Sequence, residues 1–62
     1  MRKLSLEAVV LPIRSTPAAW SVEAIDRENE GTVFVSVFYG TGARERAVEY
    51  ADAKYIAYEI RQ

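Results

Sequence analysis

Residues that usually carry enzymatic chemistry are scarce in this sequence of 62 residues. It contains no histidine and no cysteine, which removes Ser-His and Cys-His nucleophilic pairs and the commonest ligands of transition metals. A carboxylate pair could still act as a general acid and base. Every aspartate and glutamate, however, falls in a predicted turn or at a polar position, without the burial that tunes the pKa of a catalytic group. We therefore expect a protein that is not an enzyme and that binds no metal or cofactor.

A Gly-Thr-Gly turn at residues 40–42 stands between a predicted strand and a predicted helix. Backbone N–H groups in such a turn can bind a phosphate at the start of the helix. The third glycine of the dinucleotide-binding fingerprint is absent, because Glu45 takes its place and would repel an anion. We therefore interpret this segment as a tight turn and a helix cap.

Acidic side chains form two groups. Glu45, Glu49 and Asp52 recur at spacings of four and three, which places them on one face of a helix with carboxylates roughly 6 Å apart. The second group occupies the predicted hairpin and its tip: Glu23, Asp26, Glu28 and Glu30. Rows of carboxylates at this interval can imitate a phosphate backbone and occupy a DNA-binding groove of another protein. The alternative is an ordinary solvated surface.

A small basic patch could form from the following residues: Arg44, Arg46, Arg2, Lys3 and Arg14. The two helix arginines stand beside Glu45 and Glu49, so pairing with these carboxylates is the simpler explanation. The formal net charge is −1, whereas a protein that neutralises several phosphates usually carries a basic excess. A nucleic-acid-binding regulator that uses Arg44 and Arg46 is therefore an alternative, and direct binding to nucleic acid is not the expected function.

Aromatic residues are numerous for this length and indicate a core or an interface. One helix can cover only one face of a small sheet. The uncovered set is then either the phenylalanines or the valines of residues 32–39, and each set is more than so small a surface should expose. If the set forms an interface with a partner or a second copy, its candidate residues are Phe34, Phe38 and Tyr58.

Three predicted strands and one helix position these side chains. Period-two patterns indicate strands at residues 3–14, 19–27 and 32–39, with a short helix at residues 5–11 as an alternative for the first. The third strand is apolar on both faces, which is typical of a central strand. Residues 28–31 have turn chemistry, so the second and third strands are expected to form a hairpin.

The helix is expected to begin at Thr41 or Gly42. Its apolar stripe consists of Ala43, Ala47, Tyr50 and Ala51, and the small residues in it let the helix lie close to the sheet.

The end of the chain is ambiguous. A helix that continued to the C-terminus would bring Lys54 into the apolar stripe. A helix that ends near Tyr55 would leave Ile56, Tyr58 and Ile60 on one face of a short fourth strand, and we prefer this reading. The sequence thus predicts one α+β domain over residues 1–62, with a three- or four-stranded antiparallel sheet packed on one main helix.

The N-terminal segment does not resemble a targeting sequence. Its basic start is followed by an apolar stretch that Ser5, Glu7 and Pro12 interrupt, which is unsuited to a signal peptide or a membrane span. The lack of cysteine is compatible with the cytoplasm. We therefore expect a cytoplasmic protein without a membrane partner.

About half of the chain resembles a type common among small proteins of phages and mobile elements. The resemblance runs from Trp20-Ser21-Val22 through Phe38-Tyr39-Gly40 to a helix of the Ala-Arg-x-x-Ala-x-x-Tyr-Ala kind at residues 43–51. Some phage proteins of this build are anti-CRISPR inhibitors, which bind a defence complex without catalysis. The resemblance implies a non-catalytic protein partner, acting in the host cell if the chain is phage-encoded.

The leading hypothesis is therefore a protein-binding inhibitor that presents an acidic surface to a nucleoprotein complex, with a CRISPR surveillance complex as the expected example. Its expected contact residues are Glu45, Glu49, Asp52, Asp26, Glu28 and Glu30. The alternatives are a nucleic-acid-binding regulator and a structural homodimer whose open sheet face pairs with its twin.

Overall fold

Three consecutive strands form the first half of the computed structural model, which describes residues 2–62. They are β1 (Glu7–Pro12), β2 (Trp20–Asp26) and β3 (Thr32–Phe38), and each pairs antiparallel with the one before it. The alternation of apolar residues predicted all three strands, and the helical alternative for residues 5–11 is wrong. β1 is shorter than residues 3–14 and ends at Pro12, which has no N–H to extend a ladder.

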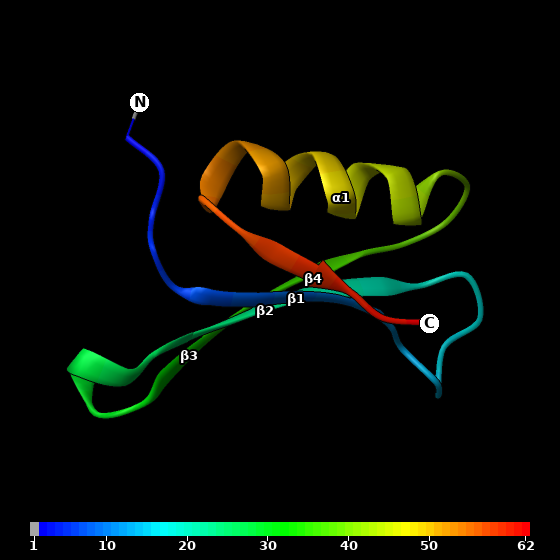
Figure 1. Cartoon of the computed structure of the whole chain (residues 1–62). Helices are drawn as coiled ribbons and strands as arrows, with labels where there is room; N and C mark the ends of the chain where they lie inside the picture. The colour runs from blue at the N-terminus through cyan, green and yellow to red at the C-terminus, as the bar shows by residue number, and fades with distance from the viewer. Residues whose placement is uncertain (1) are drawn as a thin grey trace.

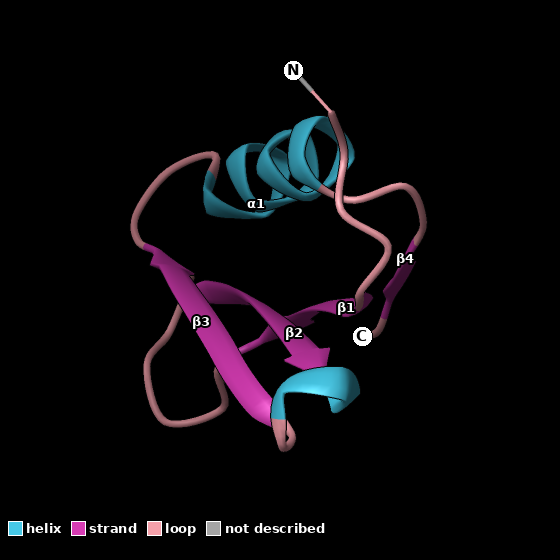
Figure 2. Ribbon diagram, turned by 90° about the vertical axis from the view of Figure 1, so that its left-hand side faces the viewer, coloured by secondary structure: helices cyan, strands magenta, loops and turns pink. Residues whose placement is uncertain are grey.

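A single-turn 3₁₀ helix, η1 (Arg27–Asn29), connects β2 to β3 and completes the predicted hairpin (Figure 2). Glu30 and Gly31 both have positive φ, at 58° and 72°, which reverses the chain. The Thr32 hydroxyl donates a hydrogen bond to the Asn29 carbonyl at 2.7 Å. This local bonding fixes the register in which β3 leaves the turn.

The C-terminal half consists of α1 (Ala43–Lys54) and β4 (Tyr58–Ile60). Tyr55 already has extended backbone angles, so the preferred reading of a helix followed by a short strand is confirmed. β4 pairs with β1 in parallel, and the strand order is β3-β2-β1-β4. The sheet is therefore mixed rather than wholly antiparallel, because α1 carries the chain back along the sheet before β4 begins (Figure 1).

The prediction that residues 32–39 form a central strand is wrong, because β3 lies at an edge of the sheet and pairs only with β2. The cause is the path of the chain after β3. α1 crosses the sheet and delivers β4 to the free side of β1. Within residues 2–62, the outer side of β3 therefore has no neighbouring strand.

The core lies between α1 and the two inner strands. Ala43, Ala47 and Ala51 are at most 2% exposed, so the predicted stripe of small residues does bring the helix close to the sheet. Tyr50, the fourth member of the stripe, is half-buried. The main buried cluster comprises Ala8, Val10, Val22, Ala24, Ala47, Ala51 and Tyr55.

Within residues 2–62, no helix combines the length and the apolar character that crossing a membrane would require.

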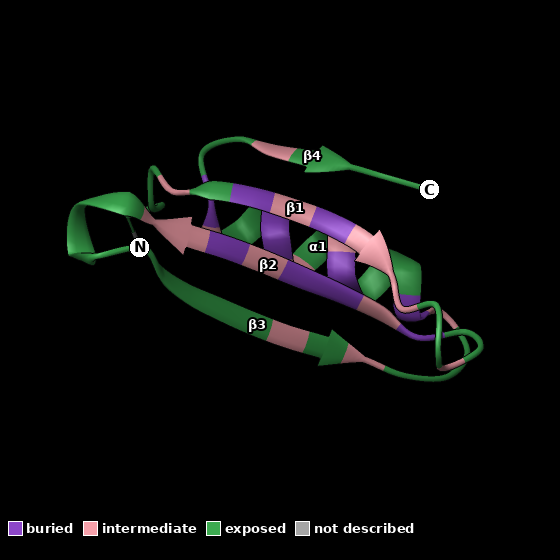
Figure 3. Ribbon diagram, turned by 90° about the horizontal axis from the view of Figure 1, so that it is seen from below, coloured by how far each residue is buried: buried purple, intermediate pink, exposed green. Residues whose placement is uncertain are grey.

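In the described part of the chain, residues 2–62, one face of the sheet has no covering layer. Figure 3 views the sheet from this side, with α1 behind the strands. Phe38 packs on the covered side, where its ring centre lies 5.5 Å from that of Tyr50. Because side chains alternate along a strand, Val33, Val35 and Val37 lie on the uncovered side. Of the two sets left open by the sequence, the valines are thus the uncovered one. We call this side of the sheet the valine face.

Candidate interaction surface on strand β3

Exposed apolar side chains gather on β3. Val33 is 52% exposed, Val35 is 56% exposed and Val37 is 39% exposed, all on the valine face. Phe34 is 45% exposed on the opposite side of the same strand. A single exposed apolar residue is normal, but several on one strand form the kind of patch that marks an interaction surface.

The backbone of β3 is equally accessible. An edge strand presents unpaired N–H and C=O groups, and proteins usually protect such an edge with charges, prolines, bulges or short strands. The seven residues of β3, Thr-Val-Phe-Val-Ser-Val-Phe, include neither a charge nor a proline. The other edge is protected: β4 has three residues, and Glu59 in it pairs with Arg61 at 3.2 Å. The sheet therefore has one edge that is open to a further strand.

The valine face becomes more polar away from β3. Ile25, Val9 and Leu11 are half-buried there, but Glu23 lies among them. At one end, the Arg27 guanidinium donates to the Glu7 carboxylate at 2.6 Å. This hydrogen bond and charge hold the pKa of Glu7 below its usual value. The apolar surface is thus concentrated on β3 rather than spread over the whole face.

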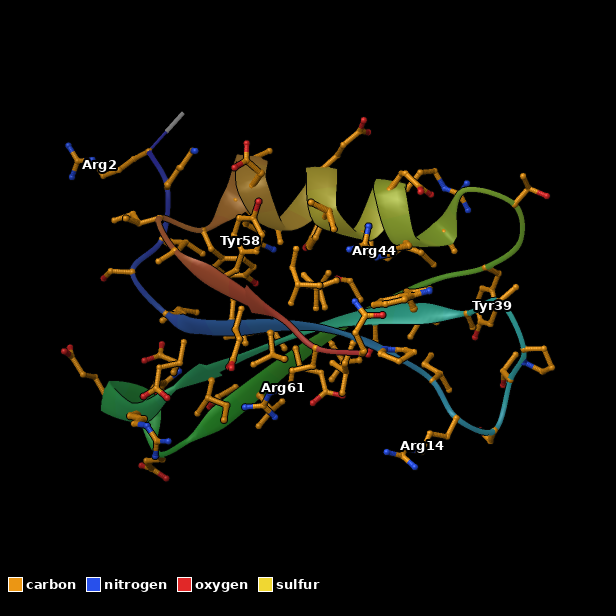
Figure 4. The ribbon with its side chains drawn as sticks, turned by 45° about the vertical axis from the view of Figure 1, so that its right-hand side comes forward. Arg2, Arg14, Tyr39, Arg44, Tyr58 and Arg61 are labelled. Atoms are coloured by element: carbon orange, nitrogen blue, oxygen red, sulfur yellow. The ribbon has the colours of Figure 1, made fainter. Side chains whose placement is uncertain are left out.

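The candidate aromatic residues have different surroundings. Phe38 and Tyr58 pack against the core cluster and are half-buried, so they serve mainly as core residues. Tyr58 also directs its hydroxyl toward Asp52, at 3.4 Å (Figure 4). Of the three, only Phe34 presents a large exposed area.

The structure does not bring the two acidic groups together. Glu45, Glu49 and Asp52 lie exposed on the side of α1 opposite its alanine stripe, and we call them the acidic helix surface. Glu28 and Glu30 lie exposed at the hairpin tip, and half-buried Asp26 and Glu23 lie along β2. The hairpin tip lies beyond one end of the sheet, away from the outer side of α1 (Figure 1). The two acidic groups are therefore separate parts of the surface rather than one continuous acidic face.

The helix arginines do not pair with Glu45 and Glu49, so that prediction is wrong. Within residues 2–62, the ion pairs are those of Arg27 with Glu7 and of Arg61 with Glu59. Arg44 instead lies over the Trp20 ring, 5.6 Å from its centre. An aromatic face within reach competes with a solvated carboxylate, because an exposed ion pair contributes little.

Arg46 stabilises the turn before α1. Its guanidinium donates to the Thr41 carbonyl at 2.5 Å and to the Tyr39 carbonyl. Gly40 and Gly42 have φ of 80° and 76°, and Gly42 is the N-cap, which confirms the interpretation of a tight turn and helix cap. Arg46 is therefore engaged within its own chain.

The basic residues are not gathered into one patch. Arg2, Arg14 and Arg44 lie well apart in Figure 4, at the N-terminus, in the loop after β1 and on α1. These three arginines therefore do not form a continuous basic surface along which a phosphate backbone could run.

A polar cluster that the sequence did not predict lies beside α1. The Tyr50 hydroxyl accepts hydrogen bonds from Lys54 Nζ at 2.8 Å and from the Ser36 hydroxyl at 3.2 Å. These donors lower the pKa of Tyr50, and the phenol in turn raises the pKa of Lys54. Burial raises the pKa of Tyr55, the next tyrosine along the chain.

Within residues 2–62, no three acidic side chains lie close enough to hold a metal ion.

We expect the Lys54→Met substitution to raise the pKa of Tyr50, because it removes the donor that favours the phenolate. The lowered pKa means that this interaction stabilises the fold as the phenolate forms, and that its contribution is lost as pH falls through the folded pKa. The raised pKa of Lys54 means that the contribution is also lost as pH rises through that value. The pH titration of tyrosine ring NMR signals measures the shift. Arg14→Met is the control, and an unchanged Tyr50 titration in Lys54→Met would contradict this assignment.

Comparisons with protein-family models, with curated proteins and with solved structures each found no match to this chain.

Proposed function

We propose that this chain is a non-catalytic protein-binding module whose contact surface is β3, through both its open edge and its exposed side chains. The observation that carries the proposal is the row of Val33, Val35 and Val37, at least 39% exposed, on an uncharged edge strand. A strand added to such an edge gains main-chain hydrogen bonds, and the alternating side chains provide selectivity. The non-catalytic part of the proposal rests on the lack of histidine and cysteine.

The acidic helix surface supports a second candidate function. Glu45, Glu49 and Asp52 are exposed, and none of them takes part in an ion pair with residues 2–62. An inhibitor of phage or mobile-element origin could present this row to the basic groove of a nucleoprotein complex, such as a CRISPR surveillance complex. The separate hairpin acids would then lie outside the contact. For either function we propose a cytoplasmic location, which the lack of cysteine supports.

Affinity capture from the native cell distinguishes the two functions. The wild-type chain is compared with Val35→Lys and with a helix variant in which Glu45, Glu49 and Asp52 are all replaced by lysine. We expect Val35→Lys to reduce the amount of captured partner by roughly tenfold or more, because a charge would enter an apolar contact. The helix variant should retain the partner.

The opposite pattern would favour the second candidate. Unchanged capture by both variants would contradict both functions. Circular dichroism of each variant shows whether the fold is intact, and all four substituted positions are exposed, so the fold should be retained.

A further inference from the structure

We infer that the partner of β3 is a second copy of this chain. In this arrangement, the β3 strands of two copies pair antiparallel about a two-fold axis that passes through Val35. The inference rests on the proposed function, because it names the protein that the β3 surface binds. The product is a continuous eight-stranded sheet in which β3 has a strand on each side.

The first support is the mismatch between the sequence of β3 and its place in the sheet. Both of its faces carry apolar residues, as expected of a strand with neighbours on both sides. Within one chain it has a neighbour on one side only. Pairing with a second β3 makes it an inner strand, and its composition then fits its surroundings.

The second support is self-complementarity. A two-fold axis perpendicular to the sheet keeps both valine faces on the same side, so residues of the same face must lie opposite each other. An axis at Val35 pairs all seven residues of β3 and sets Val35 against Val35 of the second copy. It also sets Val33 against Val37, and Phe34 against Ser36. Because β3 has no charged residue, no like charges meet across the axis.

The third support is the exposed area of the chain. It exposes 4540 Å², whereas a compact monomer of its 7.0 kDa mass exposes about 4000 Å². The excess of about 500 Å² compares with about 800 Å² that each partner buries in a standard interface. The chain thus has surface left to bury, and its most exposed run of apolar strand residues is β3.

Packing the two valine faces against each other fits less well. It would bury Glu23 of both copies, and it would also place the Glu7–Arg27 ion pairs in the contact. Burying charges without new partners opposes association. Pairing through the β4 edge meets a similar obstacle, since β4 has only three residues, one of them Glu59, which pairs with Arg61 just after the strand. The β3 edge avoids both difficulties.

Cysteine variants test the arrangement directly, because the native chain contains no cysteine. Residues opposite each other on antiparallel strands have Cα atoms about 4.5–5.5 Å apart, which suits a disulfide. We expect Val35→Cys to form a disulfide-linked dimer on mild oxidation. Val33→Cys and Val37→Cys should each crosslink poorly alone and well when mixed. Ala53→Cys, exposed on α1, is the control and should stay largely monomeric.

Sedimentation velocity of the unmodified chain completes the test. We expect its mass to rise from monomer to dimer between low and high micromolar concentration, and Val35→Lys to remain monomeric. A wild-type monomer at high micromolar concentration, or crosslinking of Val35→Cys no faster than that of Ala53→Cys, would overturn the dimer. If capture of another protein is still lost in Val35→Lys, β3 binds a foreign strand and the proposed function stands. If capture is unaffected by Val35→Lys, the proposed function fails with the dimer.

Discussion

Replacement of Tyr55 by alanine is expected to remove most of the stability of the fold. Tyr55 is 2% exposed and belongs to the main buried cluster. Its backbone also joins the end of α1 to the N-terminal segment, through an N–H donated to the Ala51 carbonyl at 2.9 Å and a bridge to Leu4, and alanine keeps both of these contacts. Loss of a buried aromatic side chain costs about 3–5 kcal/mol. The whole free energy of unfolding of so short a chain is about 3–9 kcal/mol.

Urea denaturation followed by circular dichroism measures this loss. Tyr39→Ala is the matched control, since Tyr39 is 63% exposed and should change the free energy of unfolding by about 0.5 kcal/mol or less. Equal midpoints for the two variants would show that Tyr55 does not hold the core together.

Enlargement of Ala47 to leucine is the second large effect that we expect. Ala47 has no exposed surface and lies in the middle of the alanine stripe, where α1 meets the inner strands. The larger side chain would have to push α1 away from Val10 and Val22 or adopt a strained rotamer. Overpacking of this kind costs about 1–3 kcal/mol and occasionally more.

The exposed Ala53 provides the control on the same helix. Ala53→Leu adds the same atoms with nearly the same helix propensity, so its free energy of unfolding should stay within about 0.5 kcal/mol of wild type. The difference between the two leucine variants isolates the close approach of α1 to the sheet. If Ala47→Leu were as stable as Ala53→Leu, the helix would not pack as closely as its alanines indicate.

The sequence predicted those features that depend on local pattern. The alternation of side chains located all three long strands, and the spacing of Ala43, Ala47 and Ala51 identified the buried side of α1. The conflict between Lys54 and the apolar stripe placed the end of the helix. Each of these inferences uses only residues within a few positions of one another, where backbone geometry dictates the outcome.

The order and direction of the strands could not be predicted in the same way. The parallel pairing of β4 with β1 and the edge position of β3 depend on which strand the chain reaches after α1 has crossed the sheet. One signal was available: β4 carries the charged Glu59 and is followed by Arg61, which is common at sheet edges, whereas β3 carries no charge. In a single chain, however, both strands are edges.

The sequence predicted which side chains are exposed better than it predicted which side chains contact each other. The spacing of Glu45, Glu49 and Asp52 correctly placed them on one exposed face. Arg44 lies over the Trp20 ring, and Arg46 donates to loop carbonyls. These partners are brought within reach only by the tertiary fold. The Tyr50–Lys54 hydrogen bond had a visible signal, because the two residues are four apart on one helix. Its third member, Ser36, could be found only from the register of β3 against α1.

The central claim is that two copies of the chain pair through β3, and amide NMR spectra recorded over a range of protein concentrations test it most directly. As the chain is concentrated from the low micromolar to the millimolar range, the signals of Val33, Val35 and Val37 should shift and their outward N–H groups should become protected from exchange. Signals of Glu45, Glu49 and Asp52 should not move. Shifts confined to the acidic helix surface, or β3 signals that are unchanged at every concentration, would contradict the account.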